Sequence, residues 1–487
     1  MKTRSLLLLL IGLALAGGCQ PLATQSSAEL LPRATLFGAP DRASVQLSPD
    51  GEHISYLAPV DGVLNVWVAP RADLDRAKPI TQDTGRGIRN YNWAMTSEHI
   101  LFTQDTGGDE NWRLYVVDIA SGQQRDLTPF DNTQARIQQV SFKHPSEILV
   151  GINNRNPQLH DIYRVDLQTG ERALVLENPG FAGFVVDDDF NVRYAFQLTP
   201  DGGAQVLARG EDGEFTPAFA IPAEDVLTTA PVMISPDGST LYLTDSRGRD
   251  RSALIAWSTE TGEQRVLAED AKADVANVLF HPTERTPQIV SFEYLQEEWK
   301  ALPGSSYGED LEALQEELGD GEISIASRTQ ADDAWVVAHM SSDAPVRYYI
   351  WDRENDEARY LFPNRTALEG KTLAKMHPRV IRSRDGLELV SYLSLPPGQD
   401  GDGDGVPAAA LPMVLLVHGG PWARDSFGYN SLHQLLANRG YAVLSVNFRG
   451  SPGADGASCS RSCHAPTVHR ARAAPSAALR PEHRHHR

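Results

Sequence analysis

Two short phrases in this sequence have residue types at spacings that could do chemistry. Gly304-Ser305-Ser306-Tyr307-Gly308 matches Gly-x-Ser-x-Gly, the pattern in which a sharp, strained turn between a strand and a helix exposes a nucleophilic serine. The residues before it, 297–303, are not the apolar run of a buried strand, so the strained turn is not expected here. We therefore interpret 304–308 as a surface loop inside the repeated part of the chain rather than as a nucleophile.

The second phrase is acidic. Asp400, Asp402 and Asp404, followed by Gly405, reproduce the opening of a calcium loop, in which alternate carboxylates and a glycine turn surround the ion. The twelfth position of such a loop is a bidentate Glu, but here it is Leu411. We interpret the phrase as a solvated turn, with calcium binding as the alternative, and predict neither a metal nor a cofactor.

The elements that could position a site are clearest after about residue 370. Met413–Val417 is a continuous apolar run that suits a strand buried on both faces of a parallel sheet, and it ends at His418-Gly419-Gly420-Pro421. Apolar spacing over 431–438 predicts a helix, and Ala442–Val446 is a second buried strand. Strand, helix and strand make a βαβ unit, so we predict an α/β domain here.

Internal repetition organises the earlier part of the chain. A strand that ends in a turn recurs from positions 66, 115, 163, 206, 255 and 349, with one weak copy near 302. A polar turn before an alternating strand also recurs, most clearly at Ser48-Pro49-Asp50-Gly51 and Ser235-Pro236-Asp237-Gly238. A repeat of roughly 40–50 residues with several strands is typical of a propeller blade. We predict an all-β, seven-bladed propeller over 35–365, with a short helix at 309–318.

Three phrases of the second region carry a resemblance to a known family. Residues 418–425, 436–444 and 447–451 together resemble the start of the hydrolase domain of the prolyl oligopeptidase (S9) family, and the bacterial dipeptidyl-peptidase and acylaminoacyl-peptidase branch is the most similar in appearance. That family places a β-propeller before an α/β-hydrolase domain, which is the order predicted above. The resemblance implies a serine peptidase that hydrolyses short peptides through an acyl-enzyme, with the propeller screening substrate size.

The resemblance also implies roles for particular residues. In an α/β-hydrolase the loop after the third strand gives a backbone N–H to the oxyanion hole, so His418, Gly419 and Gly420 are the candidates. Glu297 and Glu298 form an adjacent carboxylate pair, of the kind that dipeptidyl peptidases use to hold the free amine of a substrate. A solvated pair of charges is the alternative for these two residues. Dipeptidyl, acylaminoacyl and endopeptidase specificity all stay open.

The catalytic serine, acid and histidine of the family are not found in their usual order. No Gly-x-Ser-x-Gly follows Gly450, and residues 458–487 are rich in Arg, His and Ala without strand or helix periodicity. We expect a hydrolase domain over 370–451 that is truncated, an out-of-frame basic tail over 452–487, and an inactive chain. Cys459 and Cys463 with the nearby histidines match no zinc spacing. The alternative function is a propeller lipoprotein that binds peptides or envelope proteins without catalysis.

Charge and the N-terminus indicate partners and compartment. The net charge of −20 argues against a nucleic-acid-binding surface, so short peptides are the expected partners. A basic start, an apolar run over 6–15 and Ala16-Gly17-Gly18-Cys19 resemble a bacterial signal peptide with a lipobox, in which Cys19 carries the lipid; a plain signal peptide is the alternative. We predict a leader over 1–19, a linker over 20–34, and an exported protein held only by lipid at the periplasmic face of a Gram-negative outer membrane.

Overall fold

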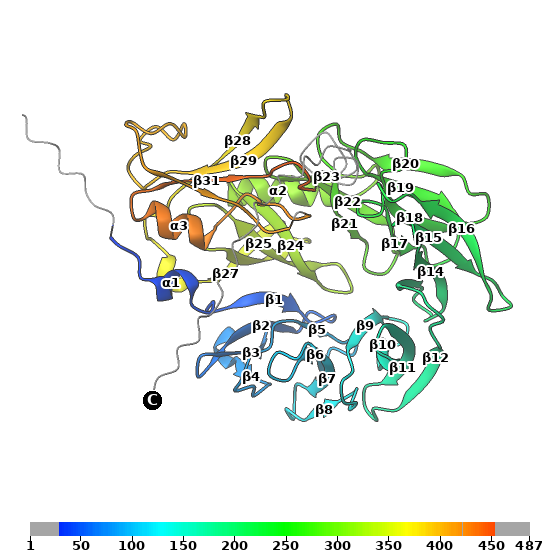
Figure 1. Cartoon of the computed structure of the whole chain (residues 1–487). Coiled ribbons are helices and arrows are strands. Elements are labelled where there is room, and N and C mark those ends of the chain that lie inside the picture. The colour runs from blue at the N-terminus through cyan, green and yellow to red at the C-terminus, as the bar shows by residue number, and fades with distance from the viewer. Residues whose placement is uncertain (1–28, 421, 453–487) are drawn as a thin grey trace, which may run out of the picture.

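The computed structural model describes residues 29–420 and 422–452. Seven antiparallel sheets follow one another between residues 43 and 363, and Figure 1 shows them in order around a ring. The first three sheets consist of β1 Ala43–Leu47, β2 His53–Val60, β3 Val63–Pro70 and β4 Lys78–Pro79 (first), β5 Tyr91–Trp93, β6 His99–Gln104, β7 Arg113–Asp118 and β8 Gln124–Asp126 (second), and β9 Ala135–Val140, β10 Glu147–Asn156, β11 Leu159–Asp166 and β12 Arg172–Leu176 (third). The fourth and fifth sheets consist of β13 Gly183–Val186, β14 Val192–Leu198, β15 Ala204–Arg209 and β16 Phe215–Ile221 (fourth), and β17 Ala230–Ile234, β18 Thr240–Asp245, β19 Ala253–Ser258 and β20 Gln264–Ala268 (fifth). The last two consist of β21 Val275–Phe280, β22 Pro287–Glu293 and β23 Glu297–Ala301 (sixth), and β24 Glu322–Arg328, β25 Ala334–Met340, β26 Arg347–Asp352 and β27 Glu357–Pro363 (seventh).

Each sheet packs on the next through a shared cluster of buried apolar side chains. The first and seventh sheets share such a cluster as well, in which Val45 meets Val336. Backbone contacts join the same two sheets, because the amide of Gln330 donates to the carbonyl of Pro49 at 2.7 Å. The packing therefore runs around the ring without a break, which fits the predicted seven-bladed propeller and covers the faces of every sheet.

The recurring strands of the sequence are the third strands of six of these sheets, β3, β7, β11, β15, β19 and β26. The sixth sheet is the exception, because it has three strands and is followed by a helix, α2 Tyr307–Leu318. This helix confirms the one predicted at 309–318 and begins two residues earlier. Its buried face presents Tyr307 and Leu314 to the seventh sheet, where Trp335 and Trp351 are fully buried.

A charged network fastens α2 to the seventh sheet. Arg353, just after β26, donates to Asp310 of α2 at 2.8 Å and to Asp332, in the turn before β25, at 2.6 Å. Its guanidinium also lies over the rings of Tyr307 and Trp335, with 4.7 and 4.6 Å to the centroids. Both carboxylates are buried, so each needs a cation nearby. Arg353 neutralises Asp310 and shares Asp332 with Arg328, whose Nη1 lies 3.6 Å from Asp332 Oδ1.

An eighth sheet belongs to the predicted α/β region. Its strands are β28 Met376–Arg382, β29 Glu388–Ser394, β31 Ala442–Val446 and β30 Met413–Leu416, in that spatial order. The β30 and β31 strands are parallel, and α3 Ser431–Ala437 connects them. This confirms the βαβ unit, and the side chain of Asn430 caps α3 by accepting from the amides of Leu432 and His433.

The assignment of residues 20–34 to a linker is wrong for the described part of that range. The chain from Glu29 onward, including the short helix α1 Arg33–Phe37, packs beside α3, as Figure 1 shows. Leu31 and Leu36 are buried there, and the amide of Leu31 donates to Asn438 Oδ1 at 2.8 Å. Burial of the two leucines gives this segment a fixed position, and the first blade strand begins only at residue 43.

Candidate oxyanion loop and interdomain cavity

The His-Gly-Gly phrase lies directly after β30, as its place behind an apolar run predicted. His418 Nε2 lies 2.9 Å from Ser451 Oγ, and its ring stacks on Phe448 with 4.4 Å between centroids. His418 and Ser451 belong to two of the three phrases that carry the family resemblance, so the fold brings these phrases together. The contact fixes the path of the loop that leaves β30.

The two glycines have the conformations and the open space that such a loop needs. Gly420 has φ +148°, and a Cβ there would lie 2.8 Å from the amide nitrogen of Trp422, so a side chain is not tolerated. Gly419 faces open space. Within the described ranges 29–420 and 422–452, no acceptor is bonded to the amide of either glycine. Two unpaired N–H groups at a strand end suit an oxyanion, although their role in catalysis stays a prediction.

Arg424 joins this loop to the propeller. Its guanidinium donates to the carbonyls of Glu293 and Tyr294, at 2.8 and 3.0 Å, in the turn between β22 and β23. Its Nε also lies 3.4 Å from the Glu293 carboxylate. The next residue, Asp425, exchanges two hydrogen bonds with Asn447, the first residue of the third phrase. The loop is thus held by both domains.

A cavity of about 800 Å³ opens between the sixth and seventh sheets and the second domain. Its propeller side is acidic, with Glu297, Glu298 and Glu322 among the residues that line it, and Phe427 comes from the second domain. The amide of Glu297 donates to Glu322 Oε1 at 2.9 Å. Burial, with the charges of Glu293 and Glu297 close by, raises the pKa of Glu322 to about 7.

The two adjacent glutamates differ in this cavity. Glu297 is half-buried, and its Oε1 accepts from Ser291 Oγ at 2.6 Å and from Asn277 Nδ2 at 2.8 Å. Glu298 is exposed, because neighbouring residues of β23 point to opposite faces. Both residues line the cavity, but their carboxylates differ in burial and in partners. The structure groups Glu297 with Glu322 of the next sheet.

The Gly-x-Ser-x-Gly phrase is only partly the predicted surface loop. Residues 304–306 lie in a turn, but Tyr307 and Gly308 begin α2, and the Tyr307 side chain is buried. Ser306 is exposed and has φ −77° and ψ −15°, which is ordinary helical backbone rather than the strained turn of a nucleophile. Its Oγ accepts from Arg353 Nη2 at 3.1 Å, and a guanidinium cannot act as the general base that activates a serine.

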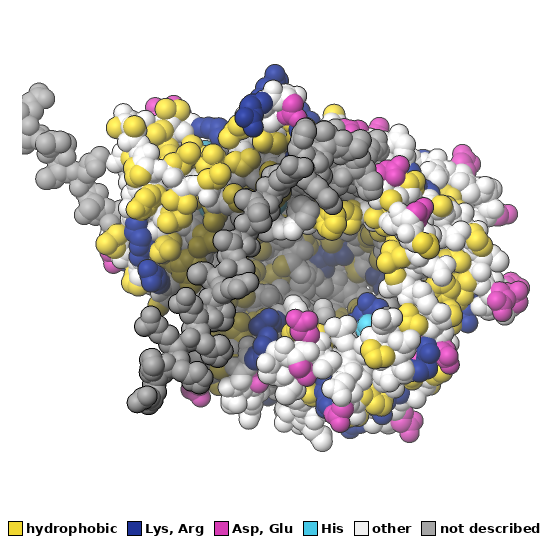
Figure 2. All heavy atoms as spheres, in the orientation of Figure 1, with side chains coloured by type: hydrophobic (Ala, Val, Ile, Leu, Met, Phe, Trp, Pro, Cys, Tyr) yellow, Lys and Arg dark blue, Asp and Glu magenta, His cyan; other side chains and the backbone are white. Residues whose placement is uncertain are grey.

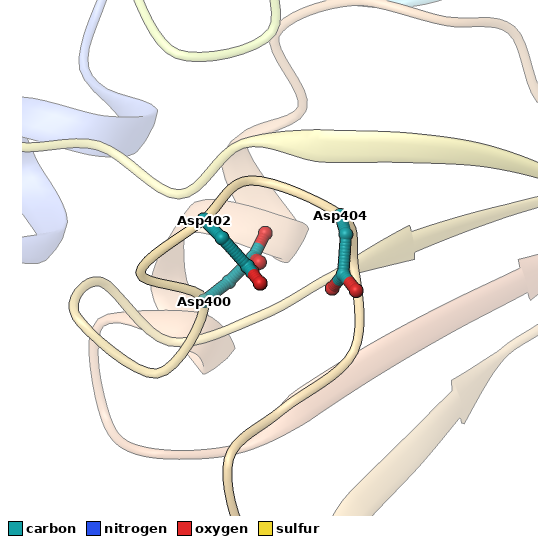
Figure 3. Close-up of side chains that lie close together, drawn as sticks. All are labelled: Asp400, Asp402 and Asp404. Atoms are coloured by element: carbon teal, nitrogen blue, oxygen red, sulfur yellow. The ribbon is translucent and has the colours of Figure 1, made fainter.

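The acidic turn before β30 lies apart from the glycine loop. Figure 3 shows Asp400, Asp402 and Asp404 converging, with one carboxylate oxygen of each within 4.8 Å of the others. Asp400 is anchored by buried His377, whose Nε2 is 2.8 Å from its Oδ2. Burial lowers the pKa of His377. Convergence of carboxylates alone does not identify a cation site, and we assign none.

Sequence reasoning missed the residues that assemble the site across domains. The sequence shows Arg424 as one residue of the 418–425 phrase and gives no sign that it contacts the propeller. The turn after Glu293, which Arg424 binds, has no sequence signature. Glu322 was not singled out, because a lone Glu at the start of a strand is common. Cys19 and residues 453–487 lie outside the described residues. Among the residues that are described, no helix has the length and apolar character to cross a membrane.

No protein-family model matches the chain. It is 50% identical over 426 residues to dipeptidyl aminopeptidase BIII of Pseudoxanthomonas mexicana, covering 87% of this chain and 62% of that protein. It is 34% identical over 458 residues to dipeptidyl peptidase family member 6 of Caenorhabditis elegans, covering 87% of this chain and 61% of that protein. The chain thus spans somewhat under two thirds of the length of these relatives.

Solved structures agree on the fold. A prolyl endopeptidase superposes with a TM-score of 0.62 at 12% identity, over 87% of this chain and 64% of that one. A puromycin hydrolase superposes with a TM-score of 0.58 at 16% identity, over 88% and 69%. These likenesses concern the fold alone. On the strength of the sequence matches, the chain belongs to the prolyl oligopeptidase (S9) family.

Proposed function

We propose that this chain supplies the peptide-recognition part of an S9 serine peptidase that acts on short peptides with a free N-terminus. The observation that carries the proposal is the acidic cavity between the two domains, where Glu297 and Glu322 lie together. A half-buried carboxylate already oriented by hydrogen bonds suits a peptide ammonium group, since charge-assisted hydrogen bonds are the strong ones. The two relatives named as dipeptidyl peptidases support the same substrate class.

The glycine loop is proposed as the oxyanion hole of the family reaction. In that reaction a serine attacks the peptide carbonyl, and the amides of Gly419 and Gly420 stabilise the charge that develops on its oxygen. The printed sequence holds no Gly-x-Ser-x-Gly after Gly450. We therefore propose that a polypeptide of this sequence binds peptides without cleaving them, and that a propeller which only binds is the alternative to an enzyme.

Peptide binding tests the proposal. Glu297→Gln should weaken the binding of a dipeptide amide with a free N-terminus by roughly tenfold or more, because a charge-assisted hydrogen bond is lost. Isothermal titration calorimetry of the full chain measures this. Glu298→Gln is the comparison variant. Glu298 also lines the cavity, but its side chain is exposed, so water and salt screen its charge and its loss should weaken binding much less than Glu297→Gln does.

N-acetylation of the same dipeptide removes the positive charge and should abolish the difference between parent and Glu297→Gln. Equal loss of affinity in Glu297→Gln and Glu298→Gln would point to general electrostatic attraction and reject Glu297 as the amine site. Binding of the acetylated peptide as tightly as the free one would instead favour acylaminoacyl or endopeptidase recognition.

Attachment by lipid at Cys19 is part of the proposal. The small residues before Cys19 support it, and Gln20 in place of Asp after the cysteine resembles the outer-membrane sorting pattern. Cys19→Ala, expressed in a Gram-negative host, should move the protein from the membrane fraction to the soluble periplasmic fraction. An immunoblot of fractionated cells measures this, and a protein that stays with the membranes would exclude the lipid anchor.

A further inference from the structure

One group of side chains joins propeller sheets that are not neighbours. Arg285, in the turn between β21 and β22 of the sixth sheet, makes a bidentate ion pair with Asp188, in the turn between β13 and β14 of the fourth sheet. The two nitrogen–oxygen distances are 2.9 and 2.7 Å. Both side chains are largely buried, with 16% of Arg285 and 5% of Asp188 exposed.

The third sheet takes part as well. The Arg285 guanidinium lies 5.5 Å from the centroid of the Phe142 ring, in the turn between β9 and β10. Ser141, the residue before Phe142, donates to the carbonyl of Asp188 at 2.5 Å. In a ring of seven sheets, two sheets separate the third from the sixth on one side and three on the other. A contact between them therefore crosses the ring.

These turns all lie at the same end of the ring. They join first to second strands, whereas the second domain contacts turns that join second to third strands, at Tyr294 and Ser342. Successive strands are antiparallel, so the two kinds of turn lie at opposite ends of the sheets. The first strands of some neighbouring sheets also lie against each other, β1 against β24 and β13 against β17, so first strands line the axis.

Figure 2 shows that the molecule is hollowed near the centre of the ring of Figure 1. We propose that Phe142, Asp188 and Arg285 form a plug across this hollow at the end far from the second domain. The plug ties the third, fourth and sixth sheets at a fixed separation. It also closes that end to peptides, so a peptide reaches the interior from the side of the second domain. This proposal does not depend on catalytic activity.

Hydrogen exchange tests the tie between sheets. Asp188→Asn keeps the side-chain volume and removes the charge, and it should speed amide exchange in its own turn and in the turn 281–286, which lies in another sheet. Asp237→Asn is the matched control, because Asp237 occupies the equivalent turn of the fifth sheet and its carboxylate accepts from Ser235 and Ser239 of that same turn. It should alter its own turn alone. Unchanged exchange at 281–286 in Asp188→Asn would overturn the tie.

Thiol labelling tests the closure. Val232, exposed on β17 of the fifth sheet, which lies between the sheets of Asp188 and Arg285, is replaced by cysteine in the full chain whose Cys19, Cys459 and Cys463 are serine. Arg285→Ala should then raise the labelling rate by a bulky dye-maleimide several-fold and leave the rate with N-ethylmaleimide nearly unchanged. Arg285→Met, which keeps the bulk and loses the charge, should leave both rates near the parent values. Equal bulky-reagent rates in the parent and Arg285→Ala would overturn the closure.

Discussion

A polypeptide of the printed 487 residues should stay unlabelled by a fluorophosphonate and release no p-nitroaniline from dipeptide p-nitroanilides. The one serine in a Gly-x-Ser-x-Gly phrase, Ser306, has helical backbone angles and an arginine rather than a histidine at its hydroxyl. Loss of a serine or histidine from a catalytic triad costs about 10⁶-fold in kcat, so turnover should fall below detection.

Labelling is followed by gel fluorescence and by mass spectrometry of the intact chain, with a full-length S9 peptidase as the positive control. Ser306→Ala is the matched variant and should behave like the parent. Labelling of the parent that disappears in Ser306→Ala would contradict the loop interpretation and make Ser306 a nucleophile. Labelling that persists in Ser306→Ala would place a reactive serine elsewhere in the chain and contradict the proposal of an inactive polypeptide.

Arg353→Ala should be the most destabilising single substitution in the propeller, at about 3–5 kcal/mol, the range for breaking a buried ion pair by removing one partner. It leaves Asp310 buried without its cation, leaves Asp332 with only the more distant Arg328 at 3.6 Å, and uncovers the rings of Tyr307 and Trp335. Urea unfolding followed by tryptophan fluorescence measures the shift.

Two further variants distinguish the effect of an unpaired buried charge from the effect of removing any arginine side chain. Arg382→Ala is the control, because its side chain is 75% exposed and contacts Glu388 at 3.2 Å, and it should change the free energy of unfolding by less than about 0.5 kcal/mol. Arg353→Met combined with Asp310→Asn should recover much of the lost stability, because the unpaired carboxylate of Asp310 is removed while Asp332 keeps Arg328 as its cation. An Arg353→Ala variant as stable as Arg382→Ala would refute this role of the network.

The repeated architecture was predictable because its signals are local. The strands from 66, 115, 163, 206, 255 and 349 recur at nearly constant spacing, and each repeat is one sheet. The helix near 309 was predictable from apolar residues three and four apart. The short helix α1 was not, since five residues are too few for a period and its burial depends on α3, about 400 residues away in the chain.

Only part of the site could be predicted, because the rest depends on contacts between segments that are far apart in the sequence. The glycine loop could be placed because it follows an apolar run that does form a strand, and the resemblance gave it a role. The prediction that this strand is buried on both faces is wrong, because β30 lies at the edge of its sheet and leaves Met413 and Leu415 exposed. Two features of the site depend on how distant segments meet in space. One is the set of hydrogen bonds from Arg424 to the carbonyls of Glu293 and Tyr294, and the other is the contact between Glu297 and Glu322. The different burial of Glu297 and Glu298, which both line the cavity, follows from the alternation of β23 and could not be read from their adjacency in the sequence.

The docking of the N-terminal segment on α3 has a consequence for synthesis. Leu31 and its partner Asn438 are 407 residues apart, so the first described residues leave the ribosome long before their binding surface exists. At ribosomal rates that interval is roughly 20–80 s. Leu31 and Leu36 must stay exposed while all seven blades are made, and chaperones that shield apolar segments have that time to bind them. The second domain can close around this segment only after α3 has been made.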